Sequence, residues 1–173
     1  MLRVLVVEDD QDTATTCAVL LRWYGHNVAI AADGPSALQA VQANPPDVVL
    51  LDLAMPKMDG WHVAQEIRQL GIAKGPLLVA ISGYGTQADQ RHSQDVGIDL
   101  HLIKPVDPLK LEDLLKQYRR IIGDTWNEFK TRVEAVRRQG QILREGTRTA
   151  VAKCCQIRET MLKPYRARWW EEI

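Results

Sequence analysis

Cysteine is scarce in this chain, with three residues in 173. Cys17, Cys154 and Cys155 lack the spacing of metal ligands, and their odd number argues against a disulfide framework. No apolar run approaches the roughly 20 residues that a membrane-spanning helix requires. The N-terminus runs directly into a short apolar segment that ends at three acidic residues, unlike a signal peptide. These absences predict a cytoplasmic protein with no membrane partner.

The chain also lacks an excess of charge of either sign: its net charge is zero, since 22 Lys and Arg residues balance 22 Asp and Glu residues. The balance hides an asymmetry along the chain. Residues 1–118 hold 9 basic and 15 acidic residues, a balance of −6, whereas residues 119–173 hold 13 basic and 7 acidic residues, a balance of +6. This change predicts a boundary, with one domain over residues 1–119 and a tail over residues 120–173.

Five short apolar segments alternate with five segments of helical periodicity before that boundary. The apolar segments are typical of strands buried on both faces of a sheet. Their alternation with helices predicts an α/β fold: a flavodoxin-like, doubly wound, five-stranded parallel sheet in the order 2-1-3-4-5. The expected strands are residues 2–7, 28–32, 48–53, 77–81 and 100–103, and the expected helices are about 13–24, 35–43, 60–70, 86–96 and 109–119.

Polar residues follow four of these strands. Parallel strands end at one edge of a sheet, and ligands bind at that edge. An acid after a single strand is more often a solvated turn or a helix cap, but several such residues meeting at one edge favour a functional site. The residues in question are Glu8, Asp9 and Asp10 after the first strand, Asp52 after the third, Ser82 after the fourth and Lys104 after the fifth.

The residue types at this edge predict phosphoryl transfer that depends on Mg²⁺. Crowded carboxylates repel one another unless a cation lies among them, and oxygen ligands suit Mg²⁺ better than zinc or copper. Asp52 is the expected nucleophile, which would form an aspartyl phosphate. Lys104 and Ser82 would contact phosphoryl oxygens. A phosphatase of the haloacid dehalogenase type would carry its nucleophilic Asp after the first strand, which argues against that class.

The same stretches resemble the receiver domains of two-component response regulators. The resemblance covers residues 2–118 and is carried by Leu5–Asp10 (LVVEDD), Asp47–Leu53 (DVVLLDL), Met55–Gly60 (MPKMDG), Ala80–Gly85 (AISGYG) and Lys104–Asp107 (KPVD). It implies that Asp52 accepts a phosphoryl group from a histidine kinase or a phosphotransfer protein. It also implies that the chain is not an enzyme, beyond assisting its own phosphorylation and dephosphorylation.

The resemblance further implies a role for each site residue. The Mg²⁺ ligands would be Asp9, Asp52 and the backbone carbonyl of Ala54, with Glu8 acting through a water. Ser82 would be the switch hydroxyl, and Lys104 the phosphate-binding lysine, with a typically cis bond to Pro105. A weaker likeness to the receivers of hybrid sensor kinases suggests a branched phosphorelay.

One position departs from the family pattern. The aromatic switch residue, three positions before the lysine, is usually Tyr or Phe and is His101 here. Two interpretations stay open: His101 swings as a switch, or it is a half-exposed histidine without that role. His26, His62 and His92 have no ligand spacing and are expected at the surface or its boundary.

The tail matches no known output module. Its apolar positions recur every 3.5 residues, which predicts a long helix that packs on another helix, as a coiled coil or, with a break near Gly140, a hairpin. A solvated extension of the fifth helix and nucleic-acid binding, which would make the protein a transcription regulator, are the alternatives. Tyr165, Trp169 and Trp170 then form a basic and aromatic end. The apolar positions are Ile122, Trp126, Phe129, Val133, Val136, Gly140, Leu143, Thr147, Ala150, Cys154, Ile157 and Met161.

Overall fold

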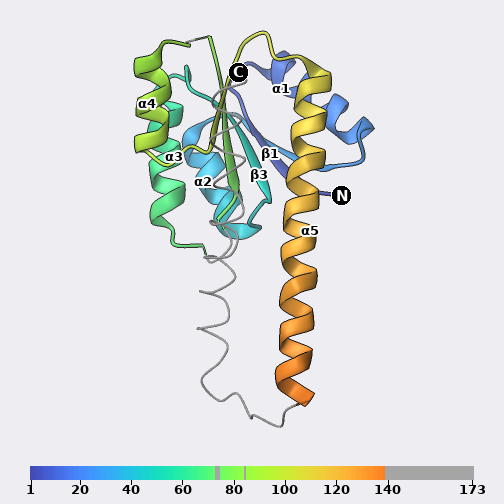
Figure 1. The fold of residues 1–173 in the computed structure, drawn as a ribbon. Coiled ribbons are helices and arrows are strands. Elements are labelled where there is room, and N and C mark those ends of the chain that lie inside the picture. Colours follow the sequence, from blue (N-terminus) through green and yellow to red (C-terminus); the bar gives the residue numbers. More distant parts are fainter. Residues whose placement is uncertain (73–74, 84, 139–173) are drawn as a thin grey trace.

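The computed structural model describes residues 1–72, 75–83 and 85–138, with side chains described up to residue 123 outside those gaps (Figure 1). The predictions made for Tyr84 and for the tail beyond Arg138 lie outside the described residues. These include the second half of the apolar repeat, the choice between one helix and a hairpin, and the aromatic end.

The described chain alternates strands and helices along its whole length. The five strands form one parallel sheet in the order β2-β1-β3-β4-β5, which confirms the predicted flavodoxin-like fold. The strands are β1 (Arg3–Val7), β2 (Asn27–Ala31), β3 (Val48–Asp52), β4 (Leu77–Ser82) and β5 (Leu100–Ile103), and the helices are α1 (Gln11–Trp23), α2 (Gly34–Ala43), α3 (Gly60–Gln69), α4 (Gln87–Asp95) and α5 (Pro108–Arg138).

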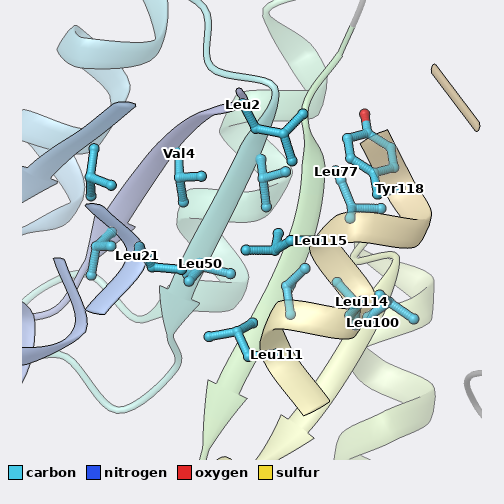
Figure 2. Packing of buried hydrophobic residues seen from close by; sticks show 14 of the residues in the cluster. Leu2, Val4, Leu21, Leu50, Leu77, Leu100, Leu111, Leu114, Leu115 and Tyr118 are labelled. Atoms are coloured by element: carbon cyan, nitrogen blue, oxygen red, sulfur yellow. The ribbon is translucent and has the colours of Figure 1, made fainter. Parts of the chain in front are cut away.

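Helices cover both faces of the sheet, with α1 and α5 on one side and α2, α3 and α4 on the other (Figure 1). Alternate residues of each strand enter one of two apolar clusters, which is why the strands are apolar almost throughout. Figure 2 shows the first cluster, in which Leu111, Leu115 and Tyr118 of α5 lie beside strand residues such as Leu50 and Leu77. The two clusters fix the sheet from both sides.

Polar residues in the loops set where four helices begin. Asp10, Asp33, Asp59 and Thr86 are the N-caps of α1, α2, α3 and α4, and each side chain accepts a hydrogen bond from a backbone N–H in the first turn. Asp10, expected among the acids of the functional edge, is instead turned to the Thr13 N–H at 2.8 Å.

Helix α5 continues far beyond the sheet. The prediction that the fifth helix ends near residue 119 is wrong, because the backbone stays helical to Arg138. Among the side chains described for α5, Tyr118 and Ile121 are the last that are buried in the core, and the helix then projects past the body of the domain (Figure 1). Local periodicity gave no stop here, since the helical pattern of the domain runs directly into that of the tail.

His26 is buried, which corrects its expected position at the surface or boundary. Its Nδ1 atom accepts a hydrogen bond from the Leu2 N–H at 3.3 Å, in the turn between α1 and β2. The ring thus satisfies a backbone donor at the start of β1. No helix in the described part of the chain is both long and apolar enough to cross a membrane.

Candidate functional site

Three charged side chains meet at the carboxyl edge of the sheet. Asp52 is the last residue of β3, Glu8 follows β1, and Lys104 follows β5. Glu8 and Asp52 are buried, with 7% and 6% of their surfaces exposed. Gly60 allows α3 to start directly against this edge, since a Cβ there would collide with the carbonyl oxygen of Asp52. The topology thus brings together residues up to 96 positions apart.

Lys104 bridges the two buried carboxylates. Its Nζ atom lies 2.9 Å from Oε2 of Glu8 and 3.0 Å from Oδ2 of Asp52. The other oxygen of Asp52, Oδ1, accepts a hydrogen bond from the Ala54 N–H at 3.1 Å. Both oxygens of the expected phosphoryl acceptor are therefore held in place, and the carboxylate has a fixed orientation.

These contacts shift the pKa values of Glu8 and Lys104. Burial raises the pKa of Glu8; the Lys104 hydrogen bond opposes that rise, and the charge of Asp52 adds to it. Burial by itself would lower the pKa of Lys104, but the hydrogen bonds it donates to Glu8 and Asp52 outweigh burial and raise it. Lys104 therefore stays a cation beside the two buried acids.

A cluster of carboxylate oxygens lies beside the lysine. One oxygen each from Glu8, Asp9 and Asp52 falls within 4.8 Å of the others. Asp9 is exposed to solvent, whereas its two partners are buried, so the cluster opens on one side. An all-oxygen donor set with room for water fits a hard divalent cation such as Mg²⁺. The predicted role of the Ala54 carbonyl stays a prediction.

Ser82 closes the edge at the end of β4. The residue is fully buried, and its backbone carbonyl accepts a hydrogen bond from the Lys104 N–H at 2.8 Å. The Lys104–Pro105 peptide bond is cis, as the resemblance implied. β4 and the start of the β5–α5 loop are thus joined directly at the site. The switching role of Ser82 stays a prediction.

His101 lies inside the protein. It has 1% of its surface exposed, so the interpretation as a half-exposed histidine is wrong. Its Nδ1 atom lies 3.0 Å from the Ser93 hydroxyl, which in turn accepts a hydrogen bond from Trp61 Nε1 at 2.9 Å. Sequence reasoning missed Trp61 and Ser93 as partners. The only sign in the sequence was a serine in an otherwise polar helix. Local sequence does not show that this serine is buried, since a surface serine would look the same.

Comparison with known proteins agrees with this geometry. Residues 4–116 match the family model of the response regulator receiver domain. The chain belongs to the response regulator receiver family. Among solved receivers, it is 27% identical to the chemotaxis protein CheY4 of Vibrio cholerae, with a TM-score of 0.65 over 68% of this chain and 98% of that one.

A second receiver shows the metal directly. The receiver domain of the sensor histidine kinase PA1611 from Pseudomonas aeruginosa has a magnesium ion coordinated in its active site cleft. It is 26% identical, with a TM-score of 0.62 over 68% of this chain and 96% of that one. Receiver domains bind Mg²⁺ at an acidic pocket, and Glu8, Asp9 and Asp52 form an acidic cluster in this chain.

Curated relatives include longer regulators. The response regulator MprA of a Mycobacterium species is 34% identical over 123 residues, which cover 71% of this chain and 51% of that protein. The probable transcriptional regulator ycf27 of Guillardia theta is 33% identical over 118 residues, 68% of this chain and 45% of that protein. The chain therefore spans about half the length of these relatives, and what it shares with them is the receiver.

Proposed function

We propose that this receiver accepts a phosphoryl group on Asp52 in an Mg²⁺-dependent phosphorelay. The observation that carries the proposal is the position of the buried Asp52 carboxylate, which contacts the Lys104 ammonium and lies within 4.8 Å of oxygens from Glu8 and Asp9. A nucleophile needs both a fixed orientation and nearby positive charge to attack an anionic phosphoryl group. The Asp52 carboxylate already has a fixed orientation and one nearby cation, the Lys104 ammonium.

The chemistry follows from the contacts of Asp52. One of its oxygens attacks phosphorus, the bond from phosphorus to the donor nitrogen or oxygen breaks, and the leaving group keeps that electron pair. When bound, Mg²⁺ orients the phosphoryl oxygens and offsets their charge. Lys104, which holds Oδ2 of Asp52, then contacts a phosphoryl oxygen. The Ser82 hydroxyl is the expected donor to another.

The donor in this proposal is a histidine kinase or a phosphotransfer protein. The chain itself is not an enzyme acting on a separate substrate, because every residue gathered at the edge serves a phosphoryl group attached to Asp52. A cytoplasmic location is part of the proposal. The half-buried Cys17 agrees with it as a free thiol whose pKa burial raises to about 11, with Glu8 adding to the rise.

Labelling of Asp52 tests the proposal. Wild-type protein incubated with acetyl phosphate is expected to gain one phosphoryl group by intact mass in the presence of Mg²⁺ and none with chelator. The Asp52→Asn variant should gain none. Asp33→Asn is the matched control, since Asp33 is an exposed N-cap and Asn also caps helices. Equal labelling of Asp52→Asn and wild type would refute the assignment.

For the tail we propose helix–helix association as the output. The support is the helical backbone of α5 to Arg138 together with the apolar repeat at Trp126, Phe129, Val133 and Val136. An alternative is DNA binding, favoured by the excess of basic residues after residue 118 and by relatives named as transcriptional regulators. Affinity for duplex DNA that falls steeply with salt and rises on phosphorylation would support this alternative.

A further inference from the structure

Helix α4 has an unusual attachment to the domain. It buries one residue among Gln87–Asp95, and that residue is Ser93. By comparison, α3 buries Val63, Ala64 and Ile67. Apolar packing resumes directly after α4 ends, at the partly buried Val96 and the buried Ile98. The body of α4 therefore depends on polar contacts for its position, whereas other helices are held by apolar side chains.

Those polar contacts converge on Ser93. The hydroxyl accepts from the indole N–H of Trp61 on α3 at 2.9 Å and lies 3.0 Å from Nδ1 of His101 on β5. With the serine proton directed at Nδ1, the indole N–H of Trp61 and the hydroxyl of Ser93 each have an acceptor. Trp61 also contacts α4 through the His92 ring, with 5.1 Å between ring centroids. One buried hydroxyl thus ties α4 to two neighbouring elements.

The same chain reaches towards the phosphoryl site. His101 pairs with Ala80 in the parallel register of β4 and β5, and Ser82 lies two residues further along β4. Residues two apart in a strand face the same side of a sheet. His101 and Ser82 therefore lie on one face, and both are buried there. The register thus makes them diagonal neighbours on adjacent strands.

We propose that Trp61, Ser93 and His101 form a clasp that seats α4, with Ser93 as its positioning residue. Loss of the Ser93–His101 hydrogen bond frees α4 from β5 and exposes the surface under the helix to partners. Switching through Ser82 and His101 is what the family resemblance implies. The clasp adds a link from His101 to α4, and its opening on phosphorylation of Asp52 rests on the proposed function. The clasp is a regulatory contact between the site and the helix that lies beside it.

Amide hydrogen exchange tests the seat of α4 in the full chain. Ser93→Ala removes both hydrogen bonds, and exchange across residues 87–95 should rise about tenfold, with β1 and β3 unchanged. Trp61→Phe keeps a ring against His92 but loses its donor, so the rise should be smaller, about twofold to threefold. Gln94→Ala, at an exposed position of α4, is the matched control and should change nothing.

Two results would overturn the clasp. One is unchanged exchange in α4 of Ser93→Ala. The other is a pair of results in which Ser93→Ala exchanges faster evenly over all elements and Trp61→Phe shows unchanged exchange in α4. That pair would mean that Ser93 stabilises the fold as a whole and does not position α4 in particular.

The phosphorylation step has a separate readout. Acetyl phosphate with Mg²⁺ should speed exchange in α4 of wild type and add little in Ser93→Ala, where α4 is already released. Intact mass on the same samples reports whether Asp52 is phosphorylated. An equal response of both phosphorylated proteins refutes the coupling and leaves the receiver function standing. Absence of phosphorylation refutes the receiver function, while the comparison of unphosphorylated proteins still decides the seat of α4.

Discussion

Lys104 has two carboxylate partners and one positive charge. Its side chain is 36% exposed, whereas those of Glu8 and Asp52 are 9% and 7% exposed. The positive charge of the lysine therefore offsets the charge of two carboxylates that have little contact with water. In the proposed phosphoryl transfer, a second cation in the cluster would leave Lys104 free to contact a phosphoryl oxygen, and the residue would then have two functions at different stages.

Lys104→Ala should make folding depend on Mg²⁺. Removing the ammonium leaves two buried carboxylates facing each other and should lower the free energy of unfolding by about 1–3 kcal/mol, less than for a fully buried pair because Lys104 is partly solvated. Mg²⁺ should then raise the melting temperature of the variant more than that of wild type. Lys110→Ala, an exposed change on α5, is the control. Equal Mg²⁺ shifts in all three proteins would contradict this account of the lysine.

His26 gives stability a pH dependence below neutrality. Burial is the main cause that lowers its pKa from the ordinary value of 6.5, and the positive charges of the N-terminus and Arg119 add to the effect. The folded state thus binds a proton less readily than the unfolded state. The stability contribution is complete above pH 6.5 and is lost as the pH falls through the lower folded pKa.

The His26→Asn variant should show a shallower loss of stability between about pH 7 and pH 5, because Asn keeps an acceptor for the Leu2 N–H and does not titrate. Urea unfolding across this range measures the difference. His62→Asn serves as the control, since the side chain of His62 is 57% exposed. A slope in His26→Asn as steep as in wild type would assign the pH dependence to other groups.

At the scale of elements, Arg68 fastens α3 to the strands beside it. Its Nε and Nη1 atoms donate to the carbonyls of Gly97 and Pro76, each at 2.9 Å, and Nη2 lies 2.7 Å from Oδ2 of Asp99. The same Asp99 oxygen accepts from the Leu78 N–H at 2.8 Å. One guanidinium thus joins the loops before β4 and β5, at the edge of the sheet opposite the phosphoryl site.

Arg68→Ala should lower the free energy of unfolding by roughly 3 kcal/mol, because it leaves the buried Asp99 charge without its cation. Arg68→Lys keeps the charge but not the planar fork, and its loss should be smaller, about 1–2 kcal/mol. Neither change should affect phosphorylation of Asp52. Urea denaturation and intact-mass labelling provide the two measurements. Equal losses for Ala and Lys would show that the ion pair contributes nothing beyond the hydrogen bonds.

At the scale of the whole molecule, the projecting part of α5 is expected to drive association. The helix has 31 residues and a length of about 46 Å. Its sequence past the core repeats apolar residues at Trp126, Phe129, Val133 and Val136, and burying each large side chain contributes about 1.5–3 kcal/mol. A repeat of this kind on one helix favours contact with a second helix.

Analytical ultracentrifugation at micromolar concentrations checks this expectation. The full chain should sediment as a larger species than a truncation to residues 1–123. The truncation keeps every core residue described for α5, and the CheY4 structure, 98% of which is covered by the match, shows that a receiver of this length folds by itself. The expectation fails if both proteins are monomers. A monomeric full chain with more helix by circular dichroism would instead indicate contact within one chain.

The fold and most of the site were predictable from local patterns. Strands buried on both faces must be apolar throughout, so the apolar run at Val48–Asp52 indicated a strand. Its place at the centre of the sheet followed from the strand order of a doubly wound fold. The convergence of Glu8, Asp52 and Lys104 followed in turn, since parallel strands share one carboxyl edge. The strand order and the convergence of these residues follow from the direction of the strands and from their burial, and the sequence pattern indicates both.

The remaining features were decided by contacts between distant residues. Asp10 and Asp9 are neighbours after the same strand, yet Asp10 caps α1 and Asp9 joins the acidic cluster, a difference set by backbone geometry and not by residue type. His101 is buried because Ser93, eight residues away on another element, supplies a hydrogen-bond partner that makes burial of its ring acceptable. The sequence around a polar residue does not show which distant residue will be its hydrogen-bond partner. Only the folded chain shows whether such a partner lies within reach.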